Sequence, residues 1–445
     1  MKIEIPTQLI NLAHVLWDVG FAVYCVGGCV RDSLLKRPVS DIDICSALTP
    51  NEMIEQCNKI GVSCQLKCER TGTVLIELDG TEYEHTTFRT ESYGKGGGHS
   101  PNEVKFTREL EKDAFRRDFS VNAIYYDIAQ GRLIDPTGGI NDIEKRVLRT
   151  TTKDPKEILD DDGLRLLRLV RFAHLLGFSV DTRTFECARE NAALLEDVSF
   201  ERKRDELIRI LMLDDVYLAL CCMDELGLWQ YVVPELVECR GMAQRPDHHR
   251  YDVMHHIFHT VESMTVDVEL RFAALLHDVG KPPCKKETGK QYLHDKYSER
   301  LAEVILKRLK MSSSSIERIC FVVANHMFDL REQAKDETVR RRFCLWGVAR
   351  VEDIIAIREA DVRGSGIETD FVARHWRSVL HDMLEEGAPF SLGELDITGK
   401  DIMEATGLSP CKQVGDIQRQ LLMHCAVHPK DNNKAILTKL LRDFV

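Results

Sequence analysis

The sequence has no hydrophobic run that approaches the ~20 residues needed to cross a membrane. Its first residues, MKIEIPTQLINLAHVL, carry an acidic side chain early and lack a small-residue cleavage site, so they do not resemble a secretory signal. Low-complexity tracts and internal repeats are missing as well. These absences predict a cytoplasmic protein that does not associate with membranes.

Paired cysteine motifs are also missing. The 15 cysteines stand singly or as Cys221-Cys222, without the repeated CxxC spacing of zinc sites. In a cytosolic chain, such residues are expected to be reduced and partly buried, and to act as small hydrophobic side chains. We assign them no chemical role.

An excess of positive charge is missing too, because 60 Lys and Arg stand against 72 Asp and Glu, a net charge of −12. This balance argues against a protein that holds nucleic acid by bulk attraction, although a local basic surface can still contact phosphates. The 445 residues exceed what one hydrophobic core supports, so two to four domains are expected.

The pattern of the chain changes near residue 140. Before it, short β-type runs such as Phe21–Val26, Val74–Leu78 and Val121–Asp127 alternate with helical stretches. After the loop and helix start DPTGGINDIEKR (135–146), apolar residues recur almost only at helical spacing. We predict an α+β fold, with a head that contains a small mixed β-sheet, followed by an all-α neck, body and tail. The expected domains are 1–140, 141–245, 246–385 and 386–445.

A double glycine is followed at short range by two acidic residues. A β-type run enters Gly27-Gly28, where the backbone can approach a phosphate closely. Asp41 and Asp43 alternate on an expected strand, so both carboxylates face one side. Two hard oxygen ligands on one face suit Mg²⁺ and a bound triphosphate. Alone, each piece is better explained as a turn or a solvated strand end, but together they predict nucleotidyl transfer.

The order GG-x-x-RD, then DxD, resembles the nucleotidyltransferase superfamily that includes polymerase-β-like enzymes. The resemblance implies that Gly27, Gly28 and Arg31 bind the nucleotide. A third catalytic carboxylate is expected at Glu84, because EHTTFR resembles the E-x-x-T-F-R segment of this superfamily. Glu82 shares its strand face, and a simple edge-strand charge is the competing interpretation.

A second motif, RRDFSVNA (116–123), narrows the resemblance. Its paired arginines can fork onto phosphate oxygens, and Asn122 can bond to a sugar or phosphate. RRDF(S/T)xNA is similar to the second class of the superfamily, which contains CCA-adding enzymes and bacterial poly(A) polymerases. This implies nucleotide binding by Arg117, Asp118 and Asn122. The glycine-rich segment 92–106 is expected to be a mobile loop, and within the family its presence disfavours CC-only addition.

The segment DDDGLRLLRLVRFA (160–173) is expected to be helical. Asp162, Arg165, Arg168 and Arg171 recur every three residues and would share one face. Asp162 can accept from the exocyclic amine of C or A, and Arg165 can donate to the acceptors beside it, so U and G would be rejected. A charged helix face is the competing interpretation. The run resembles the E-D-x-x-R-x-x-R-x-x-R-F-A segment of the same class, which implies nucleotide binding, although Asp161 replaces the glutamate.

A second constellation of possible metal ligands lies between residues 250 and 361, each on an expected helical stretch: His256, His277, Asp278, His294, His326 and Asp361. Imidazole and carboxylate suit divalent metals, and a bridging aspartate can hold a nucleophilic water. The order H…HD…H…H…D resembles the HD phosphohydrolase superfamily. It implies a site for Mg²⁺ or a divalent transition metal and hydrolysis of terminal or cyclic phosphates. His255 and His259 are alternatives to His256, which matches the register V-x-x-H.

Near the C-terminus, Gly399, Pro410 and Gly415 resemble a segment of bacterial CCA-adding enzymes, with Cys411 in place of a glycine. Together, the resemblances imply template-independent addition of CCA to the 3′ end of tRNA from CTP and ATP, with Mg²⁺ in the head. An A-adding enzyme or a poly(A) polymerase remains open. Alternatives of other classes are an HD phosphohydrolase with a non-catalytic nucleotide-binding head and a non-enzymatic RNA-binding scaffold. The sequence does not determine the oligomeric state.

Overall fold

The computed structural model describes residues 3–39, 41–92, 103–367 and 372–441. The chain divides into two compact units, Met1–Pro234 and Glu235–Val445. Most of the glycine-rich segment expected to be a mobile loop, 93–102, lies outside the described residues. The finer division into four domains stays a prediction.

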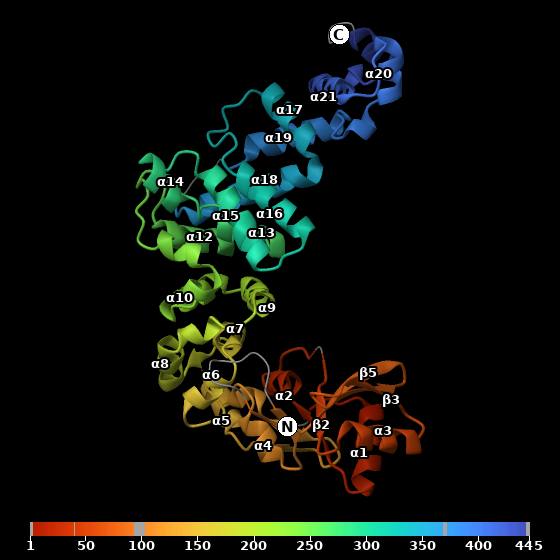
Figure 1. Cartoon of the computed structure of the whole chain (residues 1–445), viewed down its shortest axis with the longest axis vertical. Helices are drawn as coiled ribbons and strands as arrows, with labels where there is room; N and C mark the ends of the chain where they lie inside the picture. Colours follow the sequence, from red (N-terminus) through yellow and green to blue (C-terminus); the bar gives the residue numbers. More distant parts are fainter. Residues whose placement is uncertain (1–2, 40, 93–102, 368–371, 442–445) are drawn as a thin grey trace. The chain divides into compact units, whose positions relative to one another are not determined.

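Unit 1 begins with a seven-stranded mixed sheet in the order β3-β4-β5-β2-β1-β8-β9 (Figure 1). Strands β2 and β5 are parallel, and the other neighbouring pairs are antiparallel. The strands are β1 (Val23–Val26), β2 (Ile44–Ser46), β3 (Ser63–Cys68), β4 (Thr73–Leu78), β5 (Thr81–Thr87), β8 (Tyr125–Asp127) and β9 (Arg132–Ile134). This sheet, followed by a mainly helical remainder, confirms the predicted α+β class.

Three helices pack against the sheet: α1 (Thr7–Asp18), α2 (Gly28–Leu34) and α3 (Pro50–Lys59). A capping box starts α3, because the Thr49 side chain accepts from the backbone N–H of Glu52 while the Glu52 carboxylate accepts from that of Thr49. A buried cluster that includes Val26 of β1, Cys45 of β2 and Tyr125 of β8 packs behind the centre of the sheet. This core fixes the strand ends beside which the predicted acidic residues lie.

The rest of unit 1 is mainly helical. It contains β6 (Arg89–Ser92), β7 (Glu103–Phe106), α4 (Leu110–Phe115), the 3₁₀ helix η1 (Ser120–Asn122), α5 (Gly139–Lys145), β10 (Val147–Leu148), α6 (Pro155–Asp161), α7 (Leu164–Leu176), β11 (Ser179–Val180), α8 (Thr182–Glu190), η2 (Ala192–Leu195), α9 (Phe200–Leu211), α10 (Val216–Glu225) and α11 (Trp229–Val232). Helix α7 packs against α9 and α10.

Three local expectations are wrong. Asp41 and Asp43 precede β2, which begins at Ile44, and the expected strand Val121–Asp127 shortens because η1 occupies its first residues. Asp162 lies between α6 and α7, so it does not share a helix face with Arg165. Asp162 has an extended backbone, and close packing explains the glycine that follows it, because a Cβ on Gly163 would lie 2.2 Å from the carbonyl oxygen of Leu194.

Unit 2 consists of helices. They are η3 (Pro234–Cys239, which begins at the unit boundary), α12 (Val253–Ser263), α13 (Val268–Leu276), α14 (Lys281–Thr288), α15 (His294–Arg308), α16 (Ser313–Asn325), α17 (Asp336–Trp346), α18 (Val348–Gly364), α19 (Arg374–Glu385), η4 (Leu392–Glu394), α20 (Gly399–Thr406), α21 (Lys412–Val427), η5 (Pro429–Asp431) and α22 (Lys434–Leu440). Helix α12 packs against α18 and α13, and α16 packs against α13 and α15. These five helices form the frame of the second candidate site.

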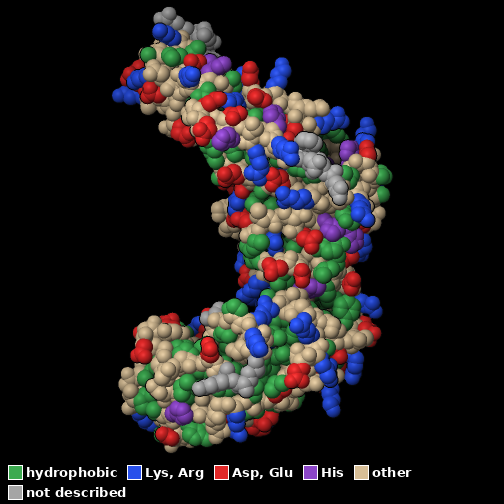
Figure 2. All heavy atoms as spheres, turned by 180° about the vertical axis from the view of Figure 1, so that it is seen from behind, with side chains coloured by type: hydrophobic (Ala, Val, Ile, Leu, Met, Phe, Trp, Pro, Cys, Tyr) green, Lys and Arg blue, Asp and Glu red, His purple; other side chains and the backbone are tan. Residues whose placement is uncertain are grey.

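Two surface features bear on partners. On the face drawn in Figure 2, basic and acidic side chains are interspersed, so the net negative charge does not produce a uniformly acidic face there. None of the helices in the described ranges is long and apolar enough to span a membrane. All 15 cysteines are free.

Candidate functional sites

The Gly27-Gly28 turn connects β1 directly to α2. Gly27 has φ 82° and ψ −136°, a conformation that L side chains rarely adopt. A Cβ placed on Gly27 would meet no atom within 4 Å, so the space beside the turn is open to an approaching group. Arg31, one helical turn further on, is buried and donates to both carboxylate oxygens of Asp32, at 2.9 and 2.8 Å.

Three carboxylates converge at one edge of β2 and β5. The backbone N–H of Val26 donates to the carbonyl of Asp43 at 3.2 Å, so the chain pairing of β1 continues to this residue. In the parallel pair, Ile44 lies opposite His85, and therefore Asp43 and Glu84 are neighbours across the strands. Desolvation by the surrounding protein atoms and the nearby Glu84 and Asp41 carboxylates raise the pKa of Asp43, although its side chain still reaches solvent. The Arg117 guanidinium and the Lys67 ammonium, which lies 2.5 Å from the Glu84 carboxylate, oppose the rise. Concentrated negative charge of this kind fits a hard divalent cation.

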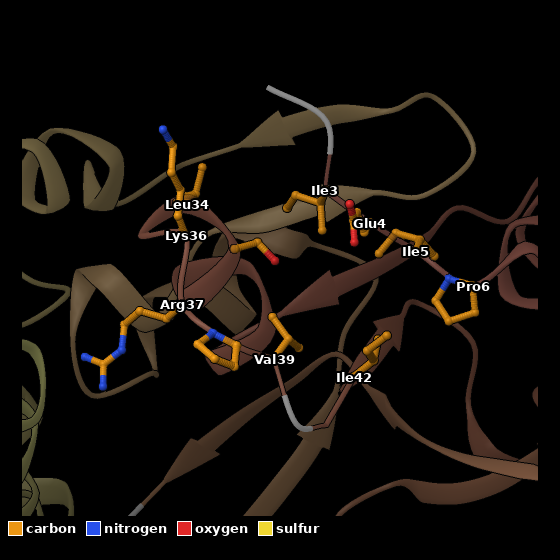
Figure 3. Close-up of a pocket in the computed structure, with 11 residues that line it drawn as sticks. Ile3, Glu4, Ile5, Pro6, Leu34, Lys36, Arg37, Val39 and Ile42 are labelled. Carbon is orange, nitrogen blue, oxygen red and sulfur yellow. The ribbon is translucent and has the colours of Figure 1, made fainter.

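The residue between the two aspartates points elsewhere. Ile42 lines a cavity of about 780 Å³ together with Ile3, Leu34 and Val39 (Figure 3). Asp41 and Asp43 are exposed, whereas Ile42 is partly buried. The alternation expected for this segment is therefore present, although the segment lies before the strand.

Arg117 is held in place by a residue that the sequence analysis missed. Asp113 is 1% exposed and accepts from Arg117 at 3.0 and 3.2 Å, from Arg116 at 2.7 and 2.9 Å, and from the hydroxyl of Tyr125 at 2.7 Å. Burial opposes the charge of Asp113, but the two arginines hold its pKa well below the usual range. The spacing of three and four residues on one helical turn was the signal available in the sequence.

Asp118 and Asn122 lie in a buried polar chain. Asn122 accepts from Arg31 at 2.7 Å and donates to Asp118 at 3.1 Å, and the other oxygen of Asp118 accepts two N–H groups of Arg168. Burial raises the pKa of Asp118, but Arg168 outweighs this effect and lowers it to about 2. This series of hydrogen bonds links the helix that follows the glycine turn to helix α7.

Arg171 continues this arrangement along α7. Its guanidinium donates to Glu206 of α9 at 2.7 Å and lies 4.2 Å from the ring centroid of Phe172. The guanidinium groups of Arg31 and Arg168 lie 5.2 Å from the same ring. Three of the predicted nucleotide-binding arginines thus surround one aromatic side chain.

Asp162 and Arg165 do not form a hydrogen-bonded pair. Asp162 accepts from Arg202 at 2.6 and 3.2 Å, whereas Arg165 donates to the carbonyls of Ile158, at 2.6 Å, and Arg116, at 2.8 Å. Both side chains are therefore oriented by separate partners. Their reading of a base stays a prediction.

In unit 2, the structure brings together all six predicted metal ligands. His277 and His326 directly follow α13 and α16, and His294 begins α15, so three of the ligands lie at helix ends instead of in helix interiors. His256 lies within α12 and Asp361 within α18. His256 is fully buried in the cluster, whereas its alternative His259 contacts Glu262 at 3.2 Å.

Asp278 lies at the centre of this cluster. One carboxylate oxygen is 3.3 Å from the Nε2 atoms of both His256 and His277, and the other is 2.9 Å from Nε2 of His294 and 3.9 Å from that of His326. The oxygen of Asp361 is 3.0 Å from Nε2 of His256. Two groups of potential ligand atoms therefore share Asp278.

The orientation of the imidazoles fits metal ions. The Nδ1 atoms of His277, His294 and His326 contact backbone carbonyls at 2.7, 2.9 and 2.7 Å. This contact places the ring proton on Nδ1 and leaves the Nε2 lone pair for a metal. Burial opposes protonation of His277, but Asp278 and Asp361 raise its pKa to about 10, so the two carboxylates favour positive charge at this imidazole, which either a proton or a metal ion on Nε2 would supply. Such a concentration of donor atoms accommodates a cation.

Three further residues adjoin the cluster: Lys281, Gln244 and His249. The ammonium of Lys281 donates hydrogen bonds to Asp278 and to Gln244. It therefore uses part of the hydrogen-bonding capacity of the central Asp278 carboxylate. The ring of His249 lies 4.6 Å from that of His256. No motif marks Gln244 or His249, because loop residues reach the cluster only through the fold.

The comparisons with known proteins match both units. The Poly A polymerase head domain matches residues 23–149, the probable RNA and SrmB-binding site of polymerase A matches residues 177–239, and the HD domain matches residues 247–361. Three successive matches in this order cover the head, the neck and the metal cluster. The chain belongs to the family of bacterial CCA-adding enzymes and poly(A) polymerases.

Relatives of this family resemble the chain over different lengths. The CCA-adding enzyme of Geobacillus sp. (strain WCH70) is 41% identical over 226 residues, which is 51% of this chain and 54% of that protein. The chain thus aligns with about half the length of this relative. A CCA-adding enzyme of Lactobacillus delbrueckii subsp. bulgaricus is 29% identical over 439 residues, which is 98% of both chains.

Solved structures share the fold. The CCA-adding enzyme of Bacillus stearothermophilus in complex with CTP has a TM-score of 0.75 and 24% identity, covering 98% of this chain and 96% of that one. The Thermotoga maritima CCA-adding enzyme complexed with tRNA has a TM-score of 0.63 and 19% identity, covering 100% and 97%. At these identities, the likeness supports the fold of the family.

Proposed function

We propose that the chain adds CCA to the 3′ end of tRNA, using CTP and ATP without a template. The observation that carries the proposal is the convergence of Asp41, Asp43 and Glu84 beside the open Gly27-Gly28 turn. Both relatives described above are CCA-adding enzymes, one of which aligns over 98% of this chain, and the two solved relatives are complexes with CTP and with tRNA.

The residues of the head suit an in-line nucleotidyl transfer. The backbone of the glycine turn receives the triphosphate, and Asp41, Asp43 and Glu84 would hold Mg²⁺, which supplies charge neutralisation and activation of the 3′-hydroxyl. The 3′ oxygen forms a bond to the α-phosphorus, the bond to the bridging oxygen breaks, and pyrophosphate leaves. Arg117, held rigidly by Asp113, adds positive charge near Asp43.

The deciding experiment offers the purified chain a tRNA that lacks CCA, with CTP and ATP singly and together. The product should end in CC with CTP alone and in CCA with both nucleotides, as read by sequencing. An enzyme that extends only a tRNA already ending in CC would be A-adding, and one that makes long A tracts would be a poly(A) polymerase.

We further propose that unit 2 is a metal-dependent phosphohydrolase. The cluster of four imidazoles around Asp278 supports this second activity. In the hydrolysis, a water oxygen forms a bond to phosphorus, the ester bond to the ribose oxygen breaks, and that oxygen takes up a proton. Release of phosphate from nucleoside phosphates with Mg²⁺, Mn²⁺, Co²⁺ or Ni²⁺ tests the activity, and no release with any of these ions would reject it.

A further inference from the structure

A second cavity adjoins the metal cluster of unit 2. It measures about 410 Å³, which is within the size range of small-ligand pockets, and it is lined in part by Tyr292, Leu293, Asp295, Met327, Leu330 and Arg331. Leu293 and Asp295 flank the ligand His294, and Met327 follows the ligand His326. The wall of the cavity is therefore continuous with two of the predicted metal ligands.

A further contact connects the cavity to the opposite side of the cluster. Arg358 of α18 donates to the carbonyl of Leu330 at 2.6 Å, and another nitrogen of its guanidinium lies 3.6 Å from Asp361. One arginine thus bridges a cavity residue and a fifth predicted ligand. These contacts place the cavity where the part of a substrate remote from its phosphate would lie.

Tyr292 is the most exposed large hydrophobic side chain of this wall, at 75%. Its backbone is nevertheless fixed, because its carbonyl accepts from the buried thiol of Cys284 at 3.1 Å. The preceding carbonyl, of Gln291, contacts Nδ1 of the ligand His294 at 2.9 Å. An exposed ring that is carried by a fixed backbone offers a surface on which a base can stack.

The remaining side chains suit a nucleoside phosphate. Leu293, Met327 and Leu330 offer apolar surface to a base, and Arg331 forms no ion pair among the described residues. Asp295 can accept a hydrogen bond from an exocyclic amine. The nearby Asp329 is already engaged, because it accepts from the backbone N–H groups of Gln333 and Ala334 at 2.9 and 3.1 Å.

We propose that this cavity is the nucleoside subsite of the unit 2 phosphohydrolase. The base of a nucleoside phosphate stacks on Tyr292, and the phosphate of the same molecule reaches the cluster around Asp278. Arg331 attracts the negative charge of that phosphate. The subsite rests on the phosphohydrolase proposed above. The same chemistry is offered by a free nucleotide and by the phosphorylated 3′ end of an RNA.

The test compares hydrolysis of adenosine 2′-phosphate with that of glycerol 2-phosphate, which has no ring, in the metal-loaded full chain. Because stacking of one base is worth about 1–3 kcal/mol, Tyr292→Ala should lower kcat/KM for the nucleotide relative to glycerol phosphate about tenfold or more, mainly through KM. Tyr292→Phe should retain the native ratio. Tyr297→Ala, a change of a nearby tyrosine on α15 that is outside the cavity lining, is the matched control. An unchanged ratio in Tyr292→Ala would overturn the subsite.

Two further arms separate the possible outcomes. A short RNA with a terminal 2′-phosphate shows whether Tyr292→Ala affects RNA ends as well as the free nucleotide. If the native chain hydrolyses no phosphate ester, the phosphohydrolase proposal fails, and the subsite is then decided by the binding of adenosine 2′-phosphate with the head saturated by CTP. Weaker binding in Tyr292→Ala than in Tyr297→Ala supports the subsite, and equal binding rejects it.

Discussion

At the scale of single residues, the head combines exposed and buried acidic groups with different tasks. Asp41 and Asp43 are exposed beside Glu84, and the charges of these neighbours raise the pKa of Asp43, so the site favours a cation. Asp113 and Asp118 are buried and paired with arginines, which hold the pKa of both carboxyls low. The first set lies beside the glycine turn, where a metal-bound triphosphate would contact it, whereas the second fixes the arginines around it.

We expect Asp43→Ala to reduce nucleotide addition by at least about 10²–10³-fold, the usual effect of losing one electrostatic group that stabilises the transition state. Radiolabelled CTP incorporation into tRNA measures the loss. Glu82→Gln, a change of an exposed acidic residue on the same strand as Glu84, should retain activity. Equal activity of the Asp43→Ala and native proteins would contradict the catalytic role.

Asp118 should contribute to stability in a pH-dependent way. Its pKa in the folded state is about 2, which is lower than its usual value near 3.8, so the contribution is present above about pH 4 and is lost as the pH falls towards 2. The shift corresponds to about 2 kcal/mol. Asp118→Asn should therefore lower the free energy of unfolding by about that amount at neutral pH, and the difference should shrink in acid.

Urea denaturation at several pH values measures this difference. The exposed Asp205, which pairs with Arg204 at 2.8 Å, provides the control substitution Asp205→Asn, with an expected effect under 1 kcal/mol. A difference between the native and Asp118→Asn proteins that stays constant from pH 7 to pH 2 would contradict the assignment.

At the scale of elements, the break between α6 and α7 determines where the predicted base-reading residues lie. Gly163 lets the chain pass close to Leu194, Asp162 pairs with Arg202, and Arg165 is held by backbone carbonyls. If Asp162 reads the exocyclic amine of C and A, Asp162→Ala should reduce discrimination against UTP and GTP about tenfold or more while affecting triphosphate binding little.

Single-turnover incorporation of each of the four nucleotides measures that discrimination. Asp160→Ala, which removes a partly exposed carboxylate of the same acidic run that pairs with Lys156, should leave base choice intact. Continued exclusion of UTP and GTP by Asp162→Ala would mean that Asp162 mainly orders Arg202.

At the scale of the whole molecule, the two candidate sites lie in separate compact units. The carboxylates of the head belong to Met1–Pro234 and the histidine cluster to Glu235–Val445. We therefore expect His277→Ala to remove phosphate hydrolysis and to retain CCA addition, and Asp43→Ala to do the reverse. Parallel assays of both activities check this separation, with His259→Ala as a control outside the cluster. Loss of both activities in either variant would contradict independent sites.

Much of this organisation followed from local patterns in the sequence. The glycine turn, the two aspartates and the RRDF segment each occupy a few neighbouring residues, so their chemistry could be inferred without the fold. The HD order runs from His256 to Asp361 and was inferred from its resemblance to a known superfamily. Element boundaries at Ile44, Leu164 and the ends of α13 and α16 were less accessible. They depend on packing between distant segments, such as the approach of Gly163 to Leu194.

The sequence by itself determined the α+β class, the kinds of side chains in both candidate sites and their order, because backbone alternation and turn chemistry act over short distances. Only the tertiary structure decided that Glu84 lies beside Asp43, that Arg168 pairs with Asp118, and that Asp278 is surrounded by four imidazoles. It also formed the cavity beside Tyr292. These contacts join residues from separate elements, and their geometry depends on how a common core packs those elements together.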